Sequence, residues 1–294
     1  MKTLLALAAA LIFCHAAWSA ELFGRVDSIV GSADITDQSG TATPVIADEQ
    51  IYEGQTINSG PDGEVQIVTE DGGMLAIRPN TTFRVDEYKA DGDASDKIFM
   101  SLLKGAVRSI TGWIGKHNSS AYRISTPNAT IGVRGTDHET VVIDSADGDQ
   151  AGTYDTVNDG ETVIDTKQGK TEVTPGKFAF APRGGARAPY FLAKRPMYFE
   201  RRKLRNEKRI APRKAYLRKN FERFRTRRIQ RVKEMRGKRL LQRKSNAGPN
   251  PPAGKGRADA LKESRGTLGE RLKKLGDKEE NVKKRRRIKR RQAD

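Results

Sequence analysis

Short runs of alternating apolar and polar residues, separated by Gly, Asp and Asn, fill residues 22–180. The run 65–68 (Val-Gln-Ile-Val) is followed by Thr-Glu-Asp-Gly-Gly and then by the apolar run 74–77. Because Asp-Gly-Gly supplies residues that adopt positive φ, this stretch predicts a tight hairpin. Similar runs recur at roughly the 8–12-residue spacing that is typical of sandwiches and barrels. The pattern therefore restricts this region to β structure.

The composition of these runs favours the same fold class. Val, Ile, Thr and Phe suit a pleated, half-buried surface, and helical periodicity is nearly absent over this region. We expect an all-β domain over residues 21–182, built as a β-sandwich, a β-roll or a short solenoid. A domain of about 160 residues can be held together by its own core.

The net charge of +18 conceals two opposed regions. Residues 21–182 contain 26 acidic and 13 basic residues, which gives −13. Residues 183–294 contain 41 basic and 11 acidic residues, which gives +30, and Lys2 supplies the remaining +1. An acidic body joined to a basic tail argues against one basic nucleic-acid-binding domain that occupies the whole chain.

The first 20 residues have the layout of a secretory signal peptide. One lysine near the start is followed by an apolar run over 4–13 and then by small residues. The run is shorter than the roughly 20 residues of a membrane-spanning helix. Cleavage is expected after Ser19 or Ala20, so we predict an exported protein, periplasmic or associated with the cell surface, without a transmembrane span. The single cysteine, Cys14, lies in this segment, so the mature chain has no disulfide or thiolate.

The sequence has no recognisable catalytic constellation. His117 and His138 remain after the signal peptide, and neither stands at a metal-ligand spacing. We interpret His138 as a structural histidine at the start of an edge strand. No nucleophile paired with a base, no phosphate-cradling loop and no dinucleotide fingerprint is present. We expect a protein that is not an enzyme and carries no cofactor.

Two acidic loops, 91–96 and 144–149, offer oxygen atoms at alternate positions, as Ca²⁺ prefers. Asn158 stands where a bidentate Glu would complete an EF-hand loop that begins at Asp147. Asp and Gly are also the default residues of solvated turns. We expect turns here and no metal site, with calcium as the alternative.

Four segments resemble the FecR domain in order and spacing. Residues 125–136 (Ser-Thr-Pro-Asn-Ala-Thr-Ile-Gly-Val-Arg-Gly-Thr) are similar to its hallmark segment, and 54–65, 71–81 and 103–107 are similar to other parts. The resemblance implies an extracytoplasmic β-rich domain. In the best-known relatives this domain follows a cytoplasmic anti-sigma segment and a membrane helix, and it relays a transport signal. A signal peptide replaces both parts here, so we expect a free-standing exported FecR-domain protein.

Arg134 is the candidate contact residue within the hallmark segment. It stands between Gly132 and Gly135, which allow tight backbone geometry. Its guanidinium is predicted either to contact a ligand or to pair with a carboxylate of the body. The Gly and Pro spacing around it favours a turn.

The first part of the tail, residues 183–244, is basic and amphipathic. Its apolar residues fall at intervals of 4, 3, 8 and 3, which keeps them roughly on one face of a helix: Leu217, Phe221, Phe224, Val232 and Met235. Such a helix can lie on an anionic membrane or bind nucleic acid. The predicted contact residues are Phe221, Phe224, Arg225 and Arg228.

The rest of the tail comprises a Pro/Gly linker over 245–256 and a polybasic segment over 257–294. Within the latter, Arg285, Arg286 and Arg287 are predicted anion contacts. The tail is expected to be helical or disordered, and an intramolecular contact between the +30 tail and the −13 body is a further expectation. Behind a signal peptide, nucleic acid is not the expected partner.

Together these observations predict a non-enzymatic binding or scaffold protein of the bacterial cell envelope. The β domain would engage a protein or glycan, and the tail would bind anionic lipids, lipopolysaccharide or other envelope polymers. The alternative is a periplasmic signalling module that relays a transport or surface signal to a membrane regulator.

Overall fold

The computed structural model describes residues 20–246 except 118, 145–148, 186 and 201–202. Residues 1–19 of the predicted signal peptide (1–20), most of the linker and the polybasic segment lie outside the described residues. The chain divides into two units, residues 1–234 and 235–294. The sheet, and all of its contacts with helices considered below, belong to the first unit.

Fifteen strands form one sheet among the described residues. Their bounds are β1 Leu22–Val30, β2 Ala33–Thr36, β3 Ala42–Pro44, β4 Gln50–Tyr52, β5 Thr56–Ser59, β6 Glu64–Thr69, β7 Met74–Ile77, β8 Thr82–Lys89, β9 Lys97–Ile110, β10 Tyr122–Ser125, β11 Thr130–Ile143, β12 Gly152–Thr166, β13 Gly169–Val173, β14 Phe178–Pro182 and β15 Tyr190–Phe191. The longest hydrogen-bonded path runs β15-β14-β12-β11-β10-β9-β7-β6-β1-β4. The all-β prediction is confirmed, as an open mixed sheet.

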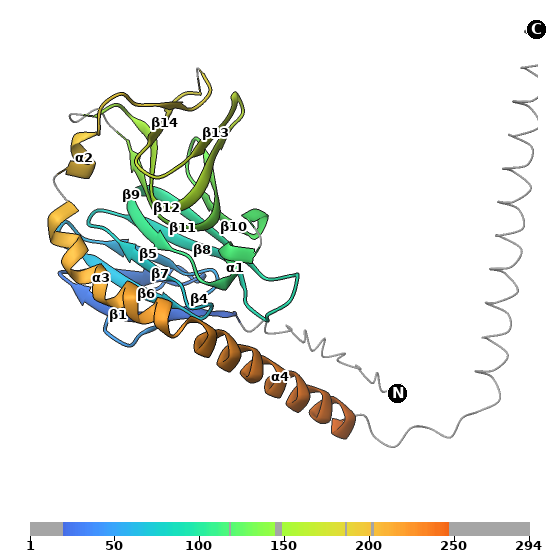
Figure 1. Cartoon of the computed structure of the whole chain (residues 1–294). Helices are drawn as coiled ribbons and strands as arrows, with labels where there is room; N and C mark the ends of the chain where they lie inside the picture. Colours follow the sequence, from blue (N-terminus) through green and yellow to red (C-terminus); the bar gives the residue numbers. More distant parts are fainter. Residues whose placement is uncertain (1–19, 118, 145–148, 186, 201–202, 247–294) are drawn as a thin grey trace, which may run out of the picture. The chain divides into compact units, whose positions relative to one another are not determined.

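The three longest strands join different parts of this sheet (Figure 1). The first half of β9 pairs with β8 and, in parallel, with β10, whereas its second half pairs with β7 and β11. β12 likewise pairs with β11 along most of its length, with β14 near its start and with β13 near its end. Because strands change neighbours along their length, the sheet bends around a shared core.

The predicted hairpin over residues 65–77 is confirmed. Val65 pairs with Ile77 and Val68 pairs with Met74 in antiparallel register. Gly72 in the turn has φ +74°, a conformation that glycine adopts without steric cost. Ile67, Leu75 and the other inward residues of these strands are buried in the main core.

The helices follow the sheet in the chain, apart from the short α1 (Trp113–His117) and the 3-10 turn Ser119–Ala121. α2 spans Met197–Glu200, α3 spans Lys203–Lys219 and α4 spans Phe221–Asn246. The tail is thus helical over the described part of 203–246, as expected from its many Arg, Lys, Glu and Leu residues. In the described part of the chain, no helix has the length and apolar character needed to cross a membrane.

Two sequence interpretations are corrected here. His138 is fully buried within β11 rather than on an edge, because β9 and β12 pair with β11 on both sides. Its Nδ1 lies 3.1 Å from Asp155 Oδ1, and that carboxylate also accepts a hydrogen bond from Thr140. The sheet also extends beyond residue 182, because β15 pairs with β14 and Tyr190 packs in an aromatic cluster with Phe180.

Candidate functional site

One face of the sheet carries apolar and charged side chains in adjoining rows. The strand register aligns Val68, Met74, Ile110 and Asp137 in one row across β6, β7, β9 and β11. The next row contains Gln66, Ala76, Arg108 and Glu139. We call these two rows, with Glu64 and Arg78 beside them, the docking face. It lies on the opposite side of β7 from the main core, because side chains alternate along a strand.

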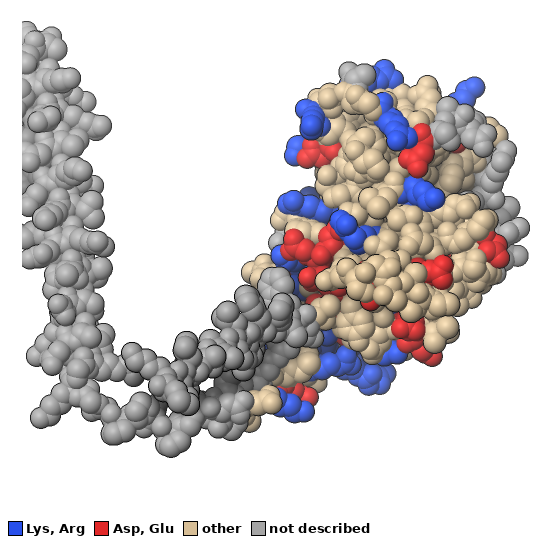
Figure 2. Space-filling view, turned by 180° about the vertical axis from the view of Figure 1, so that it is seen from behind, with Lys and Arg blue, Asp and Glu red and all other residues tan. Residues whose placement is uncertain are grey.

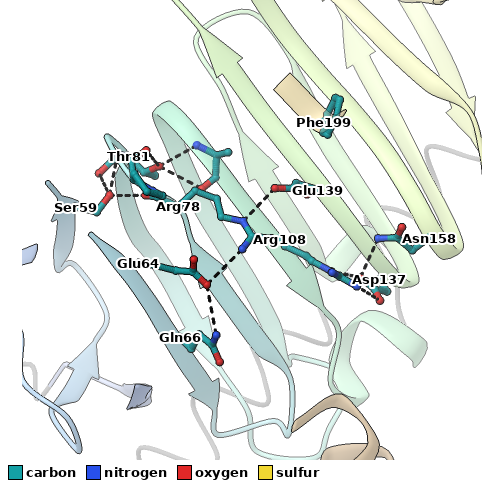
Figure 3. Close-up of polar contacts among 12 residues, drawn as sticks. Ser59, Glu64, Gln66, Arg78, Thr81, Arg108, Asp137, Glu139, Asn158 and Phe199 are labelled. Carbon is teal, nitrogen blue, oxygen red and sulfur yellow. Dashed lines mark hydrogen bonds and ion pairs between the residues drawn. The ribbon is translucent and has the colours of Figure 1, made fainter. Parts of the chain in front are cut away.

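Asp137 forms a buried ion pair on this face. Its two oxygens accept hydrogen bonds from Arg108 Nε and Nη2 at 2.8 and 2.9 Å, and Asn158 donates at 3.3 Å (Figure 3). Lys214 of α3 pairs with the same carboxylate. Burial alone would raise the pKa of Asp137, but the hydrogen bonds and charges of Arg108 and Lys214 outweigh it and lower the pKa to about 2.

Arg78 forms a second buried charge cluster beside the first (Figure 3). Its side chain is 1% exposed, with Nε 3.1 Å from Glu139 Oε1 and Nη1 3.5 Å from Glu64 Oε1. A buried arginine is tolerated only when it is paired in this way. Arg78, Glu64 and Glu139 therefore neutralise one another within the docking face. Asp137 is the carboxylate of this face that also pairs with a helix, through Lys214 of α3.

α3 covers the apolar part of the docking face (Figure 1). Ile210 and Leu217 form a buried cluster with Met74, Ala76 and Ile110. The apolar outer row of β7 was the sequence signal for this contact, because Met74 and Ala76 leave no polar residue on that side of the strand.

Ion pairs lie along both sides of this apolar contact. Arg213 pairs with Asp27, and Arg218 pairs with Asp159. Both pairs are partly exposed, so each contributes at most about 1 kcal/mol. Figure 2 shows acidic and basic side chains interspersed over the surface seen from behind.

The first half of α4 contacts the β6–β7 turn and the loop after β8. Arg228 is 4% exposed, donates from Nε to the carbonyl of Ala90 at 3.1 Å and lies 3.2 Å from Glu70 through Nη1. It also pairs with Glu21, and Arg231 lies 3.1 Å from Glu70. Because Arg228 has three partners on the β domain, it joins α4 to distant parts of the sequence. We call α3 and residues 221–234 of α4 the docked helices.

The two predicted aromatic contact residues of α4 face the protein itself. Phe221 packs against the main core, and Lys116 lies 4.0 Å from the centroid of its ring. Phe224 packs on the cluster that contains Met74, and its ring lies edge-on to Tyr216 at 6.1 Å. Both phenylalanines are on the apolar side of the helix that the spacing predicted, and the β domain is the surface against which they pack.

Asp71 in the β6–β7 turn is a fully buried carboxylate. Oδ1 accepts a hydrogen bond from the Thr69 hydroxyl, while Oδ2 has no hydrogen-bond partner among the described residues. Burial is the main cause that raises the pKa of Asp71 to about 6. Its neighbours Glu70 and Gly72 contact α4 or lie against it, so a titrating group lies directly beneath the docked helices.

The other predicted site residues have different surroundings. Arg134 is exposed on β11, opposite Glu161 of β12, next to the irregular pairing that follows it. Arg225 is half-buried and lies 4.0 Å from Glu222 on its own helix. Arg285, Arg286 and Arg287 lie outside the described residues. Binding of an external ligand by any of these residues stays a prediction.

The described acidic loop is organised by hydrogen bonds. The carboxylate of Asp96 accepts from the backbone N–H groups of Asp91 and Gly92 and from Trp113 Nε1. In the part of the chain that the structure describes, no group of three or more His, Cys, Asp or Glu residues is arranged to hold a metal ion. Most of the loop 144–149 lies outside it.

The hallmark segment predicted from the sequence runs from the end of β10 into β11. Residues 55–161 match the model of the FecR protein family. The chain therefore contains a FecR domain, and the predicted resemblance is confirmed. The matched span includes the docking-face strands β6, β7, β9 and β11.

Some solved structures are similar to parts of the chain. A cell surface anchoring domain is 22% identical over 21% of this chain and 82% of that one, with a TM-score of 0.21. Two crystal structures of a proposed anti-sigma factor from Parabacteroides distasonis are 13% identical, with TM-scores of 0.37 and 0.38. Each match covers 49% of this chain and 62% of that protein, which is less than two thirds of its length. No curated protein matches the sequence.

Proposed function

We propose that this chain is an exported, non-enzymatic signalling module of the bacterial cell envelope. Its FecR domain binds the protein's own basic helices, and the signal is the change between docked and released helices. The family match supports the signalling role. The single observation that carries the proposal is the pairing of Lys214 and Arg228 on the docked helices with Asp137, Glu21 and Glu70 of the β domain.

The docking contact combines weak and strong parts. The pairs of Arg213 with Asp27 and of Arg218 with Asp159 are partly exposed and contribute at most about 1 kcal/mol each. The buried side chains of Arg228, Ile210 and Leu217 contribute the stronger part. Release would expose these apolar side chains together with several arginines, a combination that suits an acidic partner with an apolar groove. We propose a membrane-bound regulatory protein as this partner, because a signalling module must pass its signal to another protein.

Weakened docking provides the test of this proposal. Full-length mature protein carrying Arg228→Glu is compared in intact cells with wild type and with Arg223→Glu, an exposed position on the same helix. After crosslinking, the Arg228 variant is expected to capture one membrane protein several-fold more than the other two. Equal capture by all three proteins, or capture of none, would overturn the signalling role.

A second candidate is a scaffold whose basic side chains bind anionic envelope polymers. It is favoured by the exposed arginines of α4, such as Arg223 and Arg227, which carry no intramolecular ion pair among the described residues. In the same experiment, capture of lipopolysaccharide or anionic lipid in equal amounts by the wild type and both variants supports the scaffold instead.

A further inference from the structure

A cavity of about 290 Å³ lies where β1 and the end of β6 meet α3 and α4. Its lining contains five arginines and three acidic residues, a formal balance of 5 − 3 = +2. The charged residues are Arg25, Arg213, Arg227, Arg228, Arg231, Asp27, Asp48 and Glu70. Both the FecR domain and the docked helices supply this lining, so the cavity exists only when the helices are docked.

Two of the three carboxylates that face the cavity are paired with arginines. Glu70 lies between Arg228 and Arg231, at 3.2 and 3.1 Å, and Asp27 pairs with Arg213. An anion that enters the cavity therefore meets few uncompensated negative charges.

Donor groups remain for such an anion. The side chain of Arg227 is exposed and forms no hydrogen bond or ion pair with another described residue. Arg213 Nε is buried and has no hydrogen-bond partner within the described parts of the chain. Leaving a buried donor unpaired is costly, so a movement of the Arg213 side chain toward an anion in the cavity would gain a hydrogen bond for it.

The remaining walls of the cavity strengthen charge interactions. Val26, Val68 and Phe224 form apolar parts of the lining, which lowers the local dielectric and strengthens pairing between arginine and an anion. Guanidinium groups bind phosphate oxygens through paired hydrogen bonds. A phosphate monoester carries about −1.5 to −2 charges at neutral pH, close to the balance of the lining.

From these observations we propose that the cavity binds a phosphate group, with Arg213 and Arg227 as its principal donors. The phosphate belongs either to a soluble phosphate ester or to the headgroup of an anionic lipid. Because the helices complete the cavity, a bound phosphate stabilises the docked state, as any ligand that binds one state alone must do. This site requires docking of the helices, but it does not require the signalling role proposed above.

The test uses the full mature chain and two arginine variants of α4. Arg227→Gln removes a cavity donor, whereas Arg223→Gln removes an equal charge one turn away, outside the cavity. Glycerol 3-phosphate is titrated calorimetrically at constant ionic strength set with chloride. Arg227→Gln is expected to weaken the affinity about tenfold, the loss of one charge-assisted hydrogen bond, while Arg223→Gln changes it less than about twofold.

Phosphatidylcholine vesicles that contain phosphatidylglycerol distinguish the two sources of phosphate. If Arg227→Gln reduces vesicle binding and glycerol 3-phosphate competes with it, the ligand is a lipid headgroup. If the effect of the variant is confined to glycerol 3-phosphate, the ligand is a soluble ester. Equal losses in both arginine variants, or no binding of either probe, would overturn the phosphate site and leave the crosslinking result for the signalling role unaffected.

Discussion

The guanidinium of Arg108 and the carboxylate of Asp137 form a buried, two-hydrogen-bond ion pair, on which Lys214 of α3 converges. Asp137 directly follows the FecR hallmark segment in the sequence. The same carboxylate thus stabilises the interior of the sheet and binds a helix of the basic tail. The residue that follows the FecR hallmark segment is therefore also a contact of the docked helices.

Replacing Asp137 by Asn is expected to destabilise the protein strongly. The substitution leaves Arg108 buried without its counter-charge, a change that costs about 3–5 kcal/mol in comparable buried pairs. The matched control is Asp159→Asn, because the pair of Asp159 with Arg218 is exposed and its loss should cost no more than about 1 kcal/mol. Urea unfolding of the three proteins measures both values. Equal effects would show that Asp137 has no special role.

Truncation of Leu217 tests the apolar contact of α3. Leu217 is 3% exposed in the cluster with Met74, so Leu217→Ala should lower the free energy of unfolding by about 2–4 kcal/mol. Leu240, which is 60% exposed, provides the control. Its replacement by Ala should change stability by less than about 0.5 kcal/mol. A loss at Leu240 as large as that at Leu217 would argue against docking of α3.

The buried Asp71 predicts an unusual dependence of stability on pH. Because the pKa of Asp71 is raised to about 6 in the folded protein, the folded state binds its proton more tightly than the unfolded state between pH 6 and about 4. The free energy of unfolding should therefore rise as the pH falls from 7 to about 5, by about 1 kcal/mol of the roughly 3 kcal/mol that this pKa difference supplies in full only below about pH 4. Chemical denaturation at several pH values measures this slope.

Asp71→Asn is the control for that slope. The variant cannot ionise, so its stability should be nearly constant between pH 7 and 5 and exceed that of wild type at pH 7. Below about pH 4 both proteins should lose stability, because the pKa of Asp137 is lowered to about 2 and its ion pairs disappear as it is protonated. A wild-type slope that persists in Asp71→Asn would assign the effect to another group.

Hydrogen exchange tests docking along the two helices. Basic helices in solution exchange their amides rapidly, whereas helices packed on a sheet are protected. Amides within 210–232 should therefore exchange slowly in the full chain, and Arg228→Ala should accelerate them at least tenfold. Arg223→Ala should leave them unchanged. Fast exchange over 210–232 in the wild-type protein would contradict the docked arrangement.

Local patterns predicted the β structure well, because hairpins are encoded by neighbouring residues. The Asp-Gly-Gly turn and the alternation around it identified β6 and β7. The spacing of Leu217, Phe221 and Phe224 likewise identified apolar side chains that face the β domain, although Leu217 lies on α3 and the two phenylalanines lie on α4. The sequence does not distinguish a lipid surface from a sheet as the partner of that face, since both bury the same side chains.

The charged part of the site was harder to predict from sequence. Arg78 and Arg108 are buried, although arginine is usually exposed. Their partners Glu139 and Asp137 lie on a strand distant in sequence, so the pairing depends on strand register. Met74 and Ala76 are the apolar residues of β7 that point away from the main core. They were the sequence feature that indicated that another element covers this face.

The coupling between Arg228 and Glu70 tests the central claim most directly. A double-mutant cycle with Arg228→Gln, Glu70→Gln and the double variant isolates the interaction between helix and turn from other effects of each change. Because Arg228 is buried and its Nη1 lies 3.2 Å from Glu70, docking predicts a coupling free energy of at least about 1 kcal/mol. A coupling energy indistinguishable from zero would contradict the docking of the basic helices on the FecR domain.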